Sequence, residues 1–327
     1  MALVAVTGAA GFIGRETCQA LIDSGVDVRA LVRSEPDKAV LPRAVRVVVT
    51  GDLASAHDLE RSLSGSDAVI HLAAHVPTRG ARSAQADTSL FNANALATER
   101  VFRASAGSGV KRLLYVSSVK AVGEQSFGGP LNENSPPQPT EPYGRSKLLG
   151  EETVKRLGAE MGIEVVVIRP PVVYGPGVRG HFSGLIRLAR IAHWIPLPLG
   201  GISNRRSVLF VHNLANALVM LSRHPAAAGE TFFISDGRAQ STSELIRAIG
   251  IAVGAPSKLF PISHSVLKNL GSLAGAGAEI ETLCASLEVD DRRLRRQTAW
   301  VPPFSFEQAI AITVAPPLPL VPKEAPG

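Results

Sequence analysis

Cysteine is scarce in this chain, and its two cysteines, Cys18 and Cys284, lie far apart in the sequence. Neither belongs to a CxxC pair or to a histidine–cysteine pattern with the spacing of a zinc site. The sequence therefore predicts neither a disulfide framework nor a bound metal. Cysteine usage of this kind is typical of a reducing compartment, and we expect the protein to be cytoplasmic.

The sequence has no long apolar run, and its first residues do not have the pattern of a signal peptide. No apolar stretch approaches the roughly 20 residues that a membrane-spanning helix needs. The first residues, MALVAVTG, are typical of a strand and lack the basic start and cleavage site of a signal peptide. We therefore expect no membrane span, which again favours the cytoplasm.

Aromatic residues make up only 5% of the chain, and the net charge of +6 is not gathered into a dense stripe. The exception is a cluster made of Arg292, Arg293, Arg295 and Arg296. We interpret this cluster as a solvated helix face, with contact to an anionic ligand as the alternative. A nucleic-acid surface would need denser basic residues interleaved with aromatics, so we expect no nucleic-acid partner.

Short runs of β-branched residues alternate along the chain with longer segments in which apolar residues have the spacing of a helix. The runs lie at 3–7, 28–32, 45–49, 68–72, 113–117 and 165–169. Strands that are apolar throughout and separated by helices indicate a parallel sheet covered on both faces. We therefore predict an α/β fold with a doubly wound parallel sheet of the Rossmann type.

The composition changes after Pro170, where proline and glycine become frequent. Helical periods follow at 182–192, 212–223, 242–253 and 264–274, with short strands at 207–211 and 231–234. We predict a dinucleotide-binding domain over 1–170. A smaller, mostly helical substrate lobe is predicted over 171–314, interleaved with the first domain. The proline-rich residues 315–327 are predicted to form an extended or disordered tail.

Three glycines with the spacing G-x-x-G-x-x-G follow the first run. Gly8 would permit a tight turn, Gly11 would let backbone N–H groups approach a pyrophosphate, and Gly14 would let the next helix lie close to the strand. Phe12 and Ile13 begin that helix, whose positive N-terminus suits an anion. This arrangement predicts a dinucleotide site.

The end of the second strand usually contacts the adenosine ribose, where a carboxylate favours NAD and a positive residue favours NADP. Arg33 and Ser34 occupy that place, which favours NADP(H) over NAD(H), unless Arg33 is simply a solvated strand end. Asp52 and Leu53 follow the third strand in the segment GDL. Asp52 would accept a hydrogen bond from the adenine amino group, or it is an ordinary turn aspartate.

The segment PYGRSK, 142–147, opens a long helix, and Ser117 and Ser118 end the fifth strand. Ligands bind at this edge of open α/β sheets, so the hydroxyls of Ser118 and Tyr143 and the ammonium of Lys147 are expected to converge on one oxygen. Free tyrosine titrates near 10, and we expect Lys147, one helical turn away, to lower the pKa of Tyr143. This spacing predicts that Tyr143 is an acid/base catalyst.

These motifs lie in the order and spacing of the extended short-chain dehydrogenase/reductase family, which the sequence resembles over nearly its whole length. The matching segments are TGAAGFIG, GDL, HLAA (71–74), FNANALAT (91–98), VSS (116–118), YGRSK (143–147) and RPPVVYGPG (169–177). The chain is most similar to the nucleotide-sugar branch, especially bacterial 4-ketoreductases and 4-epimerases of UDP-linked N-acetyl amino sugars. The resemblance implies a homodimer, which is common in the family.

The resemblance also implies roles for individual residues. Ser118 would orient the substrate oxygen, Tyr143 would be the acid/base, and Lys147 would tune Tyr143 and bind the nicotinamide ribose. Asn94 would support the cofactor and helix region, and Pro170 would pack near the nicotinamide. The HLAA segment would add the cofactor contacts Leu72, Ala73 and Ala74.

Substrate contacts are implied in the same way. Arg206 matches the family's position for an arginine on the substrate diphosphate, with a surface strand arginine as the alternative. His181 stands where an asparagine often contacts the phosphate side of the nucleotide sugar, and Thr282 stands where a second arginine is expected. Both departures leave the identity of the nucleotide open. Lys120 and His75 face the expected sugar site, unless His75 is a packed residue.

The two residues after Ser118 bear on the reaction. Family dehydratases carry an Asp-Glu pair there and decarboxylases a glutamate at the second position, whereas this chain has Val119 and Lys120. The remaining reactions are 4-keto reduction of a UDP-linked N-acetyl 6-deoxyhexose and 4-epimerisation. A reductase exchanges its dinucleotide in each turnover and usually draws on NADPH, so Arg33 favours reduction.

Two other functions stay open. A reductase of hydrophobic ketones, of the hydroxysteroid or flavonoid type, would share the three catalytic residues and not the diphosphate role of Arg206. A redox sensor that binds a dinucleotide without turnover would be expected to lack Tyr143 or Lys147, and both are present.

Overall fold

The computed structural model describes residues 2–75, 92–273 and 275–315. The chain forms two compact units. The first consists of Met1–Val173, Asn204–Gln240 and Ala285–Phe304, and the second of Tyr174–Ser203, Ser241–Cys284 and Ser305–Gly327. The first segment of the first unit ends at Val173, and the unit also includes two segments of the predicted substrate lobe. The predicted tail lies outside the described residues from 316 onward.

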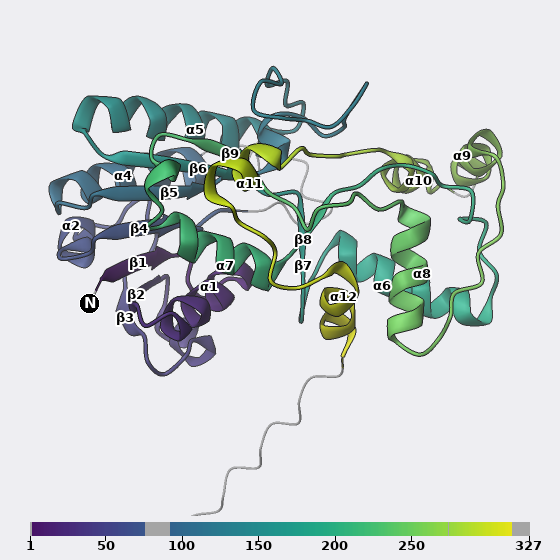
Figure 1. Ribbon diagram of the computed structural model, residues 1–327, viewed down its shortest axis with the longest axis horizontal. Coiled ribbons are helices and arrows are strands. Elements are labelled where there is room, and N and C mark those ends of the chain that lie inside the picture. Colours follow the sequence, from purple (N-terminus) through teal and green to yellow (C-terminus); the bar gives the residue numbers. More distant parts are fainter. Residues whose placement is uncertain (1, 76–91, 274, 316–327) are drawn as a thin grey trace, which may run out of the picture. The chain divides into compact units, whose positions relative to one another are not determined.

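In the described part of the chain, the first unit contains a seven-stranded sheet of order β3-β2-β1-β4-β5-β6-β9, with every pairing parallel (Figure 1). Its strands are β1 (Leu3–Thr7), β2 (Asp27–Val32), β3 (Arg46–Val49), β4 (Ala68–His71), β5 (Arg112–Val116), β6 (Glu164–Arg169) and β9 (Thr231–Phe233). The strand order reverses between β1 and β4. The predicted Rossmann-type fold is confirmed.

Two layers of helices cover the sheet (Figure 1). On one face lie α2 (Leu59–Leu63), α4 (Ala97–Gly107) and α5 (Pro142–Met161), and on the other lie α1 (Phe12–Asp23), α7 (Val211–Leu221) and α11 (Arg292–Thr298). Shorter helical turns are η1 (Glu35–Val40), η2 (Asn92–Leu96), η3 (Val119–Ala121) and η4 (Pro225–Ala227). The predicted helix at 212–223 is α7, which packs against α1 in the first unit.

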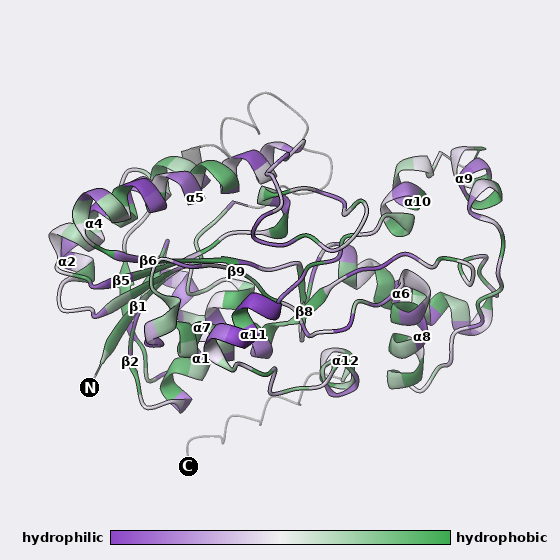
Figure 2. Ribbon diagram, turned by 45° about the horizontal axis from the view of Figure 1, so that its top comes forward, coloured by the Kyte–Doolittle hydropathy of each residue, from purple (hydrophilic) through white to green (hydrophobic). Residues whose placement is uncertain are grey.

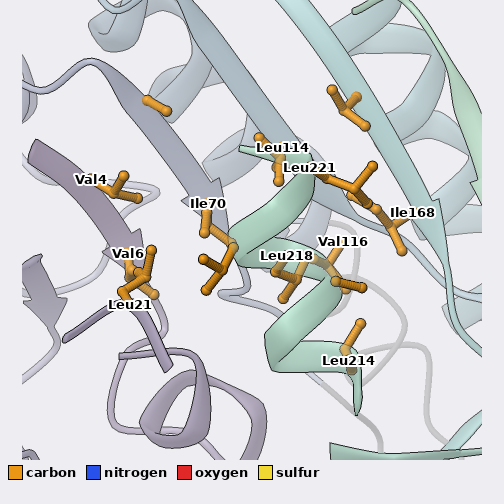
Figure 3. Close-up of a cluster of buried hydrophobic side chains, with 14 of the residues drawn as sticks. Val4, Val6, Leu21, Ile70, Leu114, Val116, Ile168, Leu214, Leu218 and Leu221 are labelled. Atoms are coloured by element: carbon orange, nitrogen blue, oxygen red, sulfur yellow. The ribbon is translucent and has the colours of Figure 1, made fainter. Parts of the chain in front are cut away.

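Alternate residues of each strand enter opposite cores, because side chains in a strand point to the two faces in turn. Leu114 and Val116 of β5 pack beneath α1 and α7, as Figure 3 shows, whereas Leu113 and Tyr115 pack beneath α4 and α5. Burying one such aliphatic side chain stabilises the fold by about 1.5–3 kcal/mol. Both faces of the sheet are therefore apolar, and Figure 2 shows its strands in hydrophobic colours.

The second unit is mostly helical. It contains α6 (His181–Trp194), α8 (Thr242–Ala252), α9 (His264–Leu273), α10 (Gly277–Cys284) and α12 (Phe306–Val314). Helix α8 packs against α6 and α12, and α9 packs against α10. The first unit holds most of a separate two-stranded sheet, which joins β7 (Val172–Tyr174) to β8 (Val208–Phe210). The strand β7 was not predicted.

The arginine cluster lies on α11, and three of its four arginines form ion pairs with carboxylates. The ion pairs are Arg292–Asp290 at 2.5 Å, Arg293–Glu230 at 2.8 Å and Arg295–Asp291 at 2.9 Å. These pairs support the interpretation of the cluster as a solvated helix face. Within residues 2–75, 92–273 and 275–315, no helix has the length and apolar character to cross a membrane. The same residues contain no group of three or more histidine, cysteine or acidic side chains placed to hold a metal ion.

Candidate active site

Most of the predicted site residues of the first unit lie at one edge of its sheet. The strands β1, β4, β5 and β6 are neighbours and parallel, so the segments that follow them emerge side by side. These segments carry the glycine turn, the HLAA residues, Ser118 and Pro170. The backbone N–H of Val119 donates to the carbonyl of Pro170 at 2.9 Å, which ties two of the segments together.

The glycine turn between β1 and α1 has the geometry that its sequence predicts. Gly8 has a φ of +66°, and the N–H of Gly11 donates to its carbonyl at 2.9 Å. A Cβ atom on Gly8 would lie 2.7 Å from the backbone nitrogen of Ala73, and one on Gly14 would overlap the carbonyl of Gly8. The turn and the close helix approach therefore both require glycine.

The start of α1 fits a dinucleotide pyrophosphate. Gly11 is the N-cap, no side chain caps the helix, and its first turn carries no acidic residue. The first N–H groups and the positive end of the helix dipole are thus available to an anion. The buried hydroxyl of Ser117, at the same edge of the sheet, has no hydrogen-bond partner among the described residues.

A buried histidine that the sequence analysis did not single out joins β1 to α4. Thr98 donates its hydroxyl proton to the carbonyl of Asn94 at 2.5 Å, so its oxygen accepts from Nε2 of His71 at 3.1 Å. Nδ1 of His71 then accepts from Thr7 at 2.6 Å, which fixes the tautomer. Burial, and then the charge of Lys147, lowers the pKa of His71 to about 3. His71 is therefore neutral beside the glycine turn. Its position at the end of an apolar strand was the feature of the sequence that could have indicated a buried histidine.

Asn94 connects the segment after β4 to α5. Its Oδ1 accepts from the backbone N–H of His75 at 2.7 Å, and its Nδ2 donates to the hydroxyl of Ser146 at 3.1 Å. Ser146 in turn donates to the carbonyl of Tyr143 at 2.8 Å. Asn94 thus orients the start of α5, and its contact with His75 is made to the backbone.

Ser118 and Tyr143 meet at the start of α5. The hydroxyl of Ser118 caps η3 by accepting from the N–H of Lys120 at 3.2 Å, and it lies close enough to the phenol of Tyr143 to act on its pKa. Gly144 permits this approach, because a Cβ atom there would overlap the carbonyl of Lys120. The glycine after the tyrosine is therefore needed to pack α5 against η3.

The expected pKa of Tyr143 is corrected by the structure. Burial raises the pKa of Tyr143 to about 12, and the hydrogen bond to Ser118 acts in the opposite direction without outweighing it. The prediction that Lys147 lowers this pKa is wrong for the protein as described. The physical reason is that burial disfavours the charged phenolate. Burial also disfavours the charged form of Lys147, so a smaller fraction of the lysine is cationic.

Lys147 is almost completely buried, with 2% of its surface exposed. Burial lowers the pKa of its ammonium to about 7, and the charge of Glu151 opposes that shift. Its Nζ lies 4.2 Å from the centroid of the Tyr115 ring, and Glu151 forms a buried ion pair with Arg169 at 2.6 Å. The hydroxyl of Tyr115 occupies the place where a side chain on Gly150 would lie.

Two carboxylates fix the residues just before Tyr143. Glu141 pairs with Lys120, with 2.6 Å between Oε2 and Nζ. Glu124 accepts from the N–H of Glu141 at 3.0 Å and from the hydroxyl of Thr140 at 2.8 Å. Sequence reasoning missed both acids. An acid directly before Pro142 was visible, whereas the contact with Glu124 spans 16 positions along the chain.

The predicted adenosine contacts lie on the loops after β2 and β3. Arg33 is exposed directly after β2, and the Ser34 hydroxyl donates to Asp37 at 3.0 Å. Asp52 accepts from the N–H of Ala54 at 2.9 Å, as a turn aspartate does.

Other predicted contacts are placed as follows. Leu53 packs against the core under α2, and Leu72 packs against the core under α1. Arg206 is partly buried, and its N–H donates to the carbonyl of Gln240 at 2.8 Å.

The structure also places Arg205, which is the neighbour of Arg206, and the two positions His181 and Thr282 that depart from the family pattern. The guanidinium of the neighbouring Arg205 is held by both oxygens of Glu288, at 2.6 and 2.7 Å. His181 and Thr282 belong to the second unit, at the start of α6 and within α10.

Comparison with known proteins gives consistent results. The model of the NAD dependent epimerase/dehydratase family matches residues 4–235. A UDP-glucose 4-epimerase from Vibrio cholerae is 32% identical over 313 residues, which cover 95% of this chain and 94% of that protein. A 3-beta-hydroxysteroid dehydrogenase from Mycolicibacterium neoaurum is 25% identical and covers 94% of this chain and 89% of its own length.

The solved structures point to the same fold. The structure of MoeE5 in complex with UDP-glucose and NAD has a TM-score of 0.75 and 26% identity, and it covers 95% of this chain and 96% of its own. The order of the motifs, the sheet topology and these matches confirm the predicted resemblance. The chain belongs to the NAD dependent epimerase/dehydratase family.

Proposed function

We propose that this protein is a nicotinamide-dependent oxidoreductase that acts at C4 of a UDP-linked hexose, as a 4-epimerase. The observation that carries the proposal is the approach of the Ser118 hydroxyl to the Tyr143 phenol at the sheet edge that also holds the glycine turn. The substrate class is supported by the Vibrio cholerae UDP-glucose 4-epimerase, because the similarity extends over nearly the whole of both chains.

Ser118 and Tyr143 have the arrangement that proton transfer at a sugar oxygen requires. The Ser118 oxygen already accepts from the N–H of Lys120, so its own proton is available to the substrate oxygen. Tyr143, with a raised pKa, is a protonated phenol at neutral pH and is suited to protonate a developing alkoxide. A bound nicotinamide would supply or accept the hydride. In the oxidative direction, Tyr143 would first have to lose its own proton, and its phenolate would then receive the proton of the C4 hydroxyl.

We assign the charge at this centre to Lys147. Its pKa of about 7 keeps part of the lysine population cationic at neutral pH, and one helical turn separates it from Tyr143. A cation there would stabilise the negative charge that develops on the substrate oxygen during the reaction. Lys147 would also bind the nicotinamide ribose. Lys120, His181 and Arg206 are proposed substrate contacts, with Arg206 on the diphosphate.

The choice between NAD(H) and NADP(H) is a separate part of the proposal. Arg33 is exposed at the end of β2, and the Asp37 carboxylate accepts from the backbone and hydroxyl of Ser34. We propose that Arg33 binds a 2′-phosphate and so admits NADP(H). Titration of the protein with NADH and NADPH, followed by fluorescence, tests this. Arg33→Ser should weaken NADPH binding about tenfold, as expected for one charge-assisted contact, and leave NADH binding unchanged.

A second candidate is the 4-keto reduction of a UDP-linked N-acetyl 6-deoxyhexose, which the position of Arg33 favours. An epimerase returns the hydride to the same sugar, whereas a reductase consumes one NADPH per turnover. The decisive experiment incubates the protein with UDP-glucose and with UDP-N-acetylglucosamine and separates the products by chromatography. Formation of the galacto isomer without net NADH production supports the epimerase.

The other outcomes of that assay assign other functions. Absorbance loss at 340 nm with NADPH and a UDP-4-keto-6-deoxy-N-acetylhexosamine would support the reductase. Turnover of a steroid ketone alone would support the hydrophobic-ketone alternative and contradict both sugar reactions. Tyr143→Phe should lower turnover about 10²–10⁴-fold while dinucleotide binding is retained. The expected homodimer is tested by light scattering of the purified protein.

A further inference from the structure

Large apolar side chains are exposed at one end of α6 in the second unit. Trp194 is 79% exposed, Ile195 61% and Phe260 44%. The segment after α6 runs beside 258–260, because the N–H of Leu197 donates to the carbonyl of Lys258 at 3.0 Å and the N–H of Phe260 donates back at 3.1 Å. These exposed groups therefore lie on neighbouring segments of one unit.

Four of the exposed residues of α6 form one stripe along the helix. Arg187, Arg190, Ile191 and Trp194 are exposed, and their spacing of three, four and seven residues confines them to about 100° of the helix surface. The buried residues of α6 are Phe182, Ala189 and Ala192, on the opposite side. The stripe faces away from the interior of the second unit, and it combines arginines with a tryptophan and an isoleucine.

The cations of this region form no ion pair with the carboxylates that the structure describes. Helix α6 contains no aspartate or glutamate. Arg187, Arg190 and Lys258 are exposed, and no carboxylate among residues 2–75, 92–273 and 275–315 lies within ion-pair distance of them. Two exposed arginines of the first unit are paired and so can serve for comparison, because Arg103 pairs with Glu99 and Arg156 with Glu160.

We propose that this surface, the α6 patch, binds the protein peripherally to an anionic phospholipid membrane. The patch consists of Arg187, Arg190, Ile191, Trp194, Ile195 and Phe260. A bilayer surface rich in phosphatidylglycerol presents anions to the arginines and an apolar boundary to the aromatic and aliphatic side chains. Trp194 suits that boundary, because its ring is amphipathic.

Charge argues against a second copy of this chain as the occupant. A two-fold interface brings the same patch of both copies together, so Arg187 and Arg190 would face their own counterparts. Like charges that meet without a carboxylate oppose such association. An anionic membrane supplies the missing negative charge to every copy at once. The proposal concerns the second unit alone and does not depend on the reaction proposed for the first.

The chain contains its own reporter for the test. Its two tryptophans are Trp194, which is 79% exposed, and Trp300, which is 5% exposed and donates from Nε1 to Asn216 at 3.0 Å. A change of tryptophan emission on mixing with vesicles therefore reports on Trp194. Trp194→Phe removes that signal and keeps an aromatic side chain at the position.

The experiment mixes the full chain with vesicles of phosphatidylcholine alone or with one third phosphatidylglycerol, and measures sedimentation and tryptophan emission. We expect binding and a blue shift with the anionic vesicles only, both weakened by high salt. Arg187→Ser combined with Arg190→Ser should weaken binding about 25-fold, from about fivefold for each cation. The matched control, Arg103→Ser with Arg156→Ser, removes the same charge from paired sites and should bind as the native chain does.

Apolar substitutions provide the second arm. Trp194→Ser should weaken vesicle binding at least tenfold, whereas Phe127→Ser, at an 85% exposed phenylalanine of the first unit, should leave it unchanged. The proposal is overturned if anionic vesicles neither sediment the protein nor shift the emission of Trp194. It is equally overturned if the control double variant loses binding as strongly, or if the emission shift follows protein concentration without vesicles.

Discussion

The ammonium of Lys147 lies over the ring of Tyr115, with Nζ 4.2 Å from the ring centroid. The negative face of an aromatic ring attracts a cation, and the attraction is strongest where water is excluded. Tyr115 lies on β5 and Lys147 on α5, so this contact joins the sheet to the helix that carries Tyr143. It opposes the effect of burial, which lowers the pKa of Lys147.

Replacing the ring of Tyr115 should change how activity depends on pH. In Tyr115→Leu the ammonium loses the ring, so the pKa of Lys147 should fall further below about 7, by roughly 0.4–1.5 units for a cation–π contact of about 0.5–2 kcal/mol. The alkaline limb of turnover should move to lower pH. Tyr115→Phe keeps the ring and should keep the native profile. Equal profiles for Leu and Phe would show that the ring does not act on Lys147.

Lys147 should also make stability depend on pH in the alkaline range. The pKa of Lys147 is about 7 in the folded protein, and its ordinary value, taken for the unfolded chain, is 10.5. Between these two pH values the unfolded chain therefore binds a proton that the folded chain lacks. Folding stability from this group therefore rises with pH, by up to about 1.4 kcal/mol per unit. The difference in unfolding free energy between the native chain and Lys147→Met should grow from pH 7.5 to 9.5. Lys111→Met removes an exposed lysine and serves as the control.

Gly8 and Gly25 separate backbone strain from steric crowding in the glycine turn. Both have φ near +70°, so alanine at either position costs about 1 kcal/mol of backbone strain. A Cβ atom on Gly25 meets nothing within 4 Å, whereas one on Gly8 lies 2.7 Å from the nitrogen of Ala73. Gly8→Ala should therefore lose more stability in thermal unfolding and should weaken NADH binding. If Gly25→Ala also lost NADH binding, general destabilisation would explain the loss of binding in both variants, and crowding at Gly8 would not be needed.

Glu124 should make the start of α5 sensitive to acid. Burial alone would raise the pKa of Glu124, but hydrogen bonds from Glu141 and Thr140 outweigh it and hold the pKa below 4.5. The stabilisation is thus present above about pH 4.5 and is lost as pH falls through the folded value. Glu124→Gln should cost about 1–2 kcal/mol at pH 7, as for a lost cap, and less at pH 3. An equal cost at both values would contradict this assignment.

Much of the first unit could be predicted because its sheet is buried on both faces. Such strands appear in sequence as apolar β-branched runs, and the runs at 3–7 and 113–117 are β1 and β5. The pairing of β9 with β6 could not be read in this way, because an apolar run does not specify its neighbour. For the same reason the helical period at 212–223 did not indicate that α7 packs against α1.

In the candidate active site, features set by the local backbone could be predicted from the sequence, whereas features set by burial or by distant contacts could not. The roles of Gly8 and Gly14 follow from local backbone requirements, so their spacing was sufficient to predict the turn. The pKa of Tyr143 was mispredicted because the spacing to Lys147 says nothing about how deeply both groups are buried. Glu124 was missed because its contacts with Thr140 arise only when the loop folds back on α5.

The side chain of Tyr115 fills the space that a side chain at position 150 would need. The phenol oxygen fills the space where any larger residue at 150 would begin, and that oxygen is enclosed without a hydrogen-bond partner among the described residues. During divergence from a common ancestor, a bulkier residue at 150 is tolerated only once position 115 has shrunk. Sequences that descend from this one should therefore show the two positions covarying, with small beside large in either order.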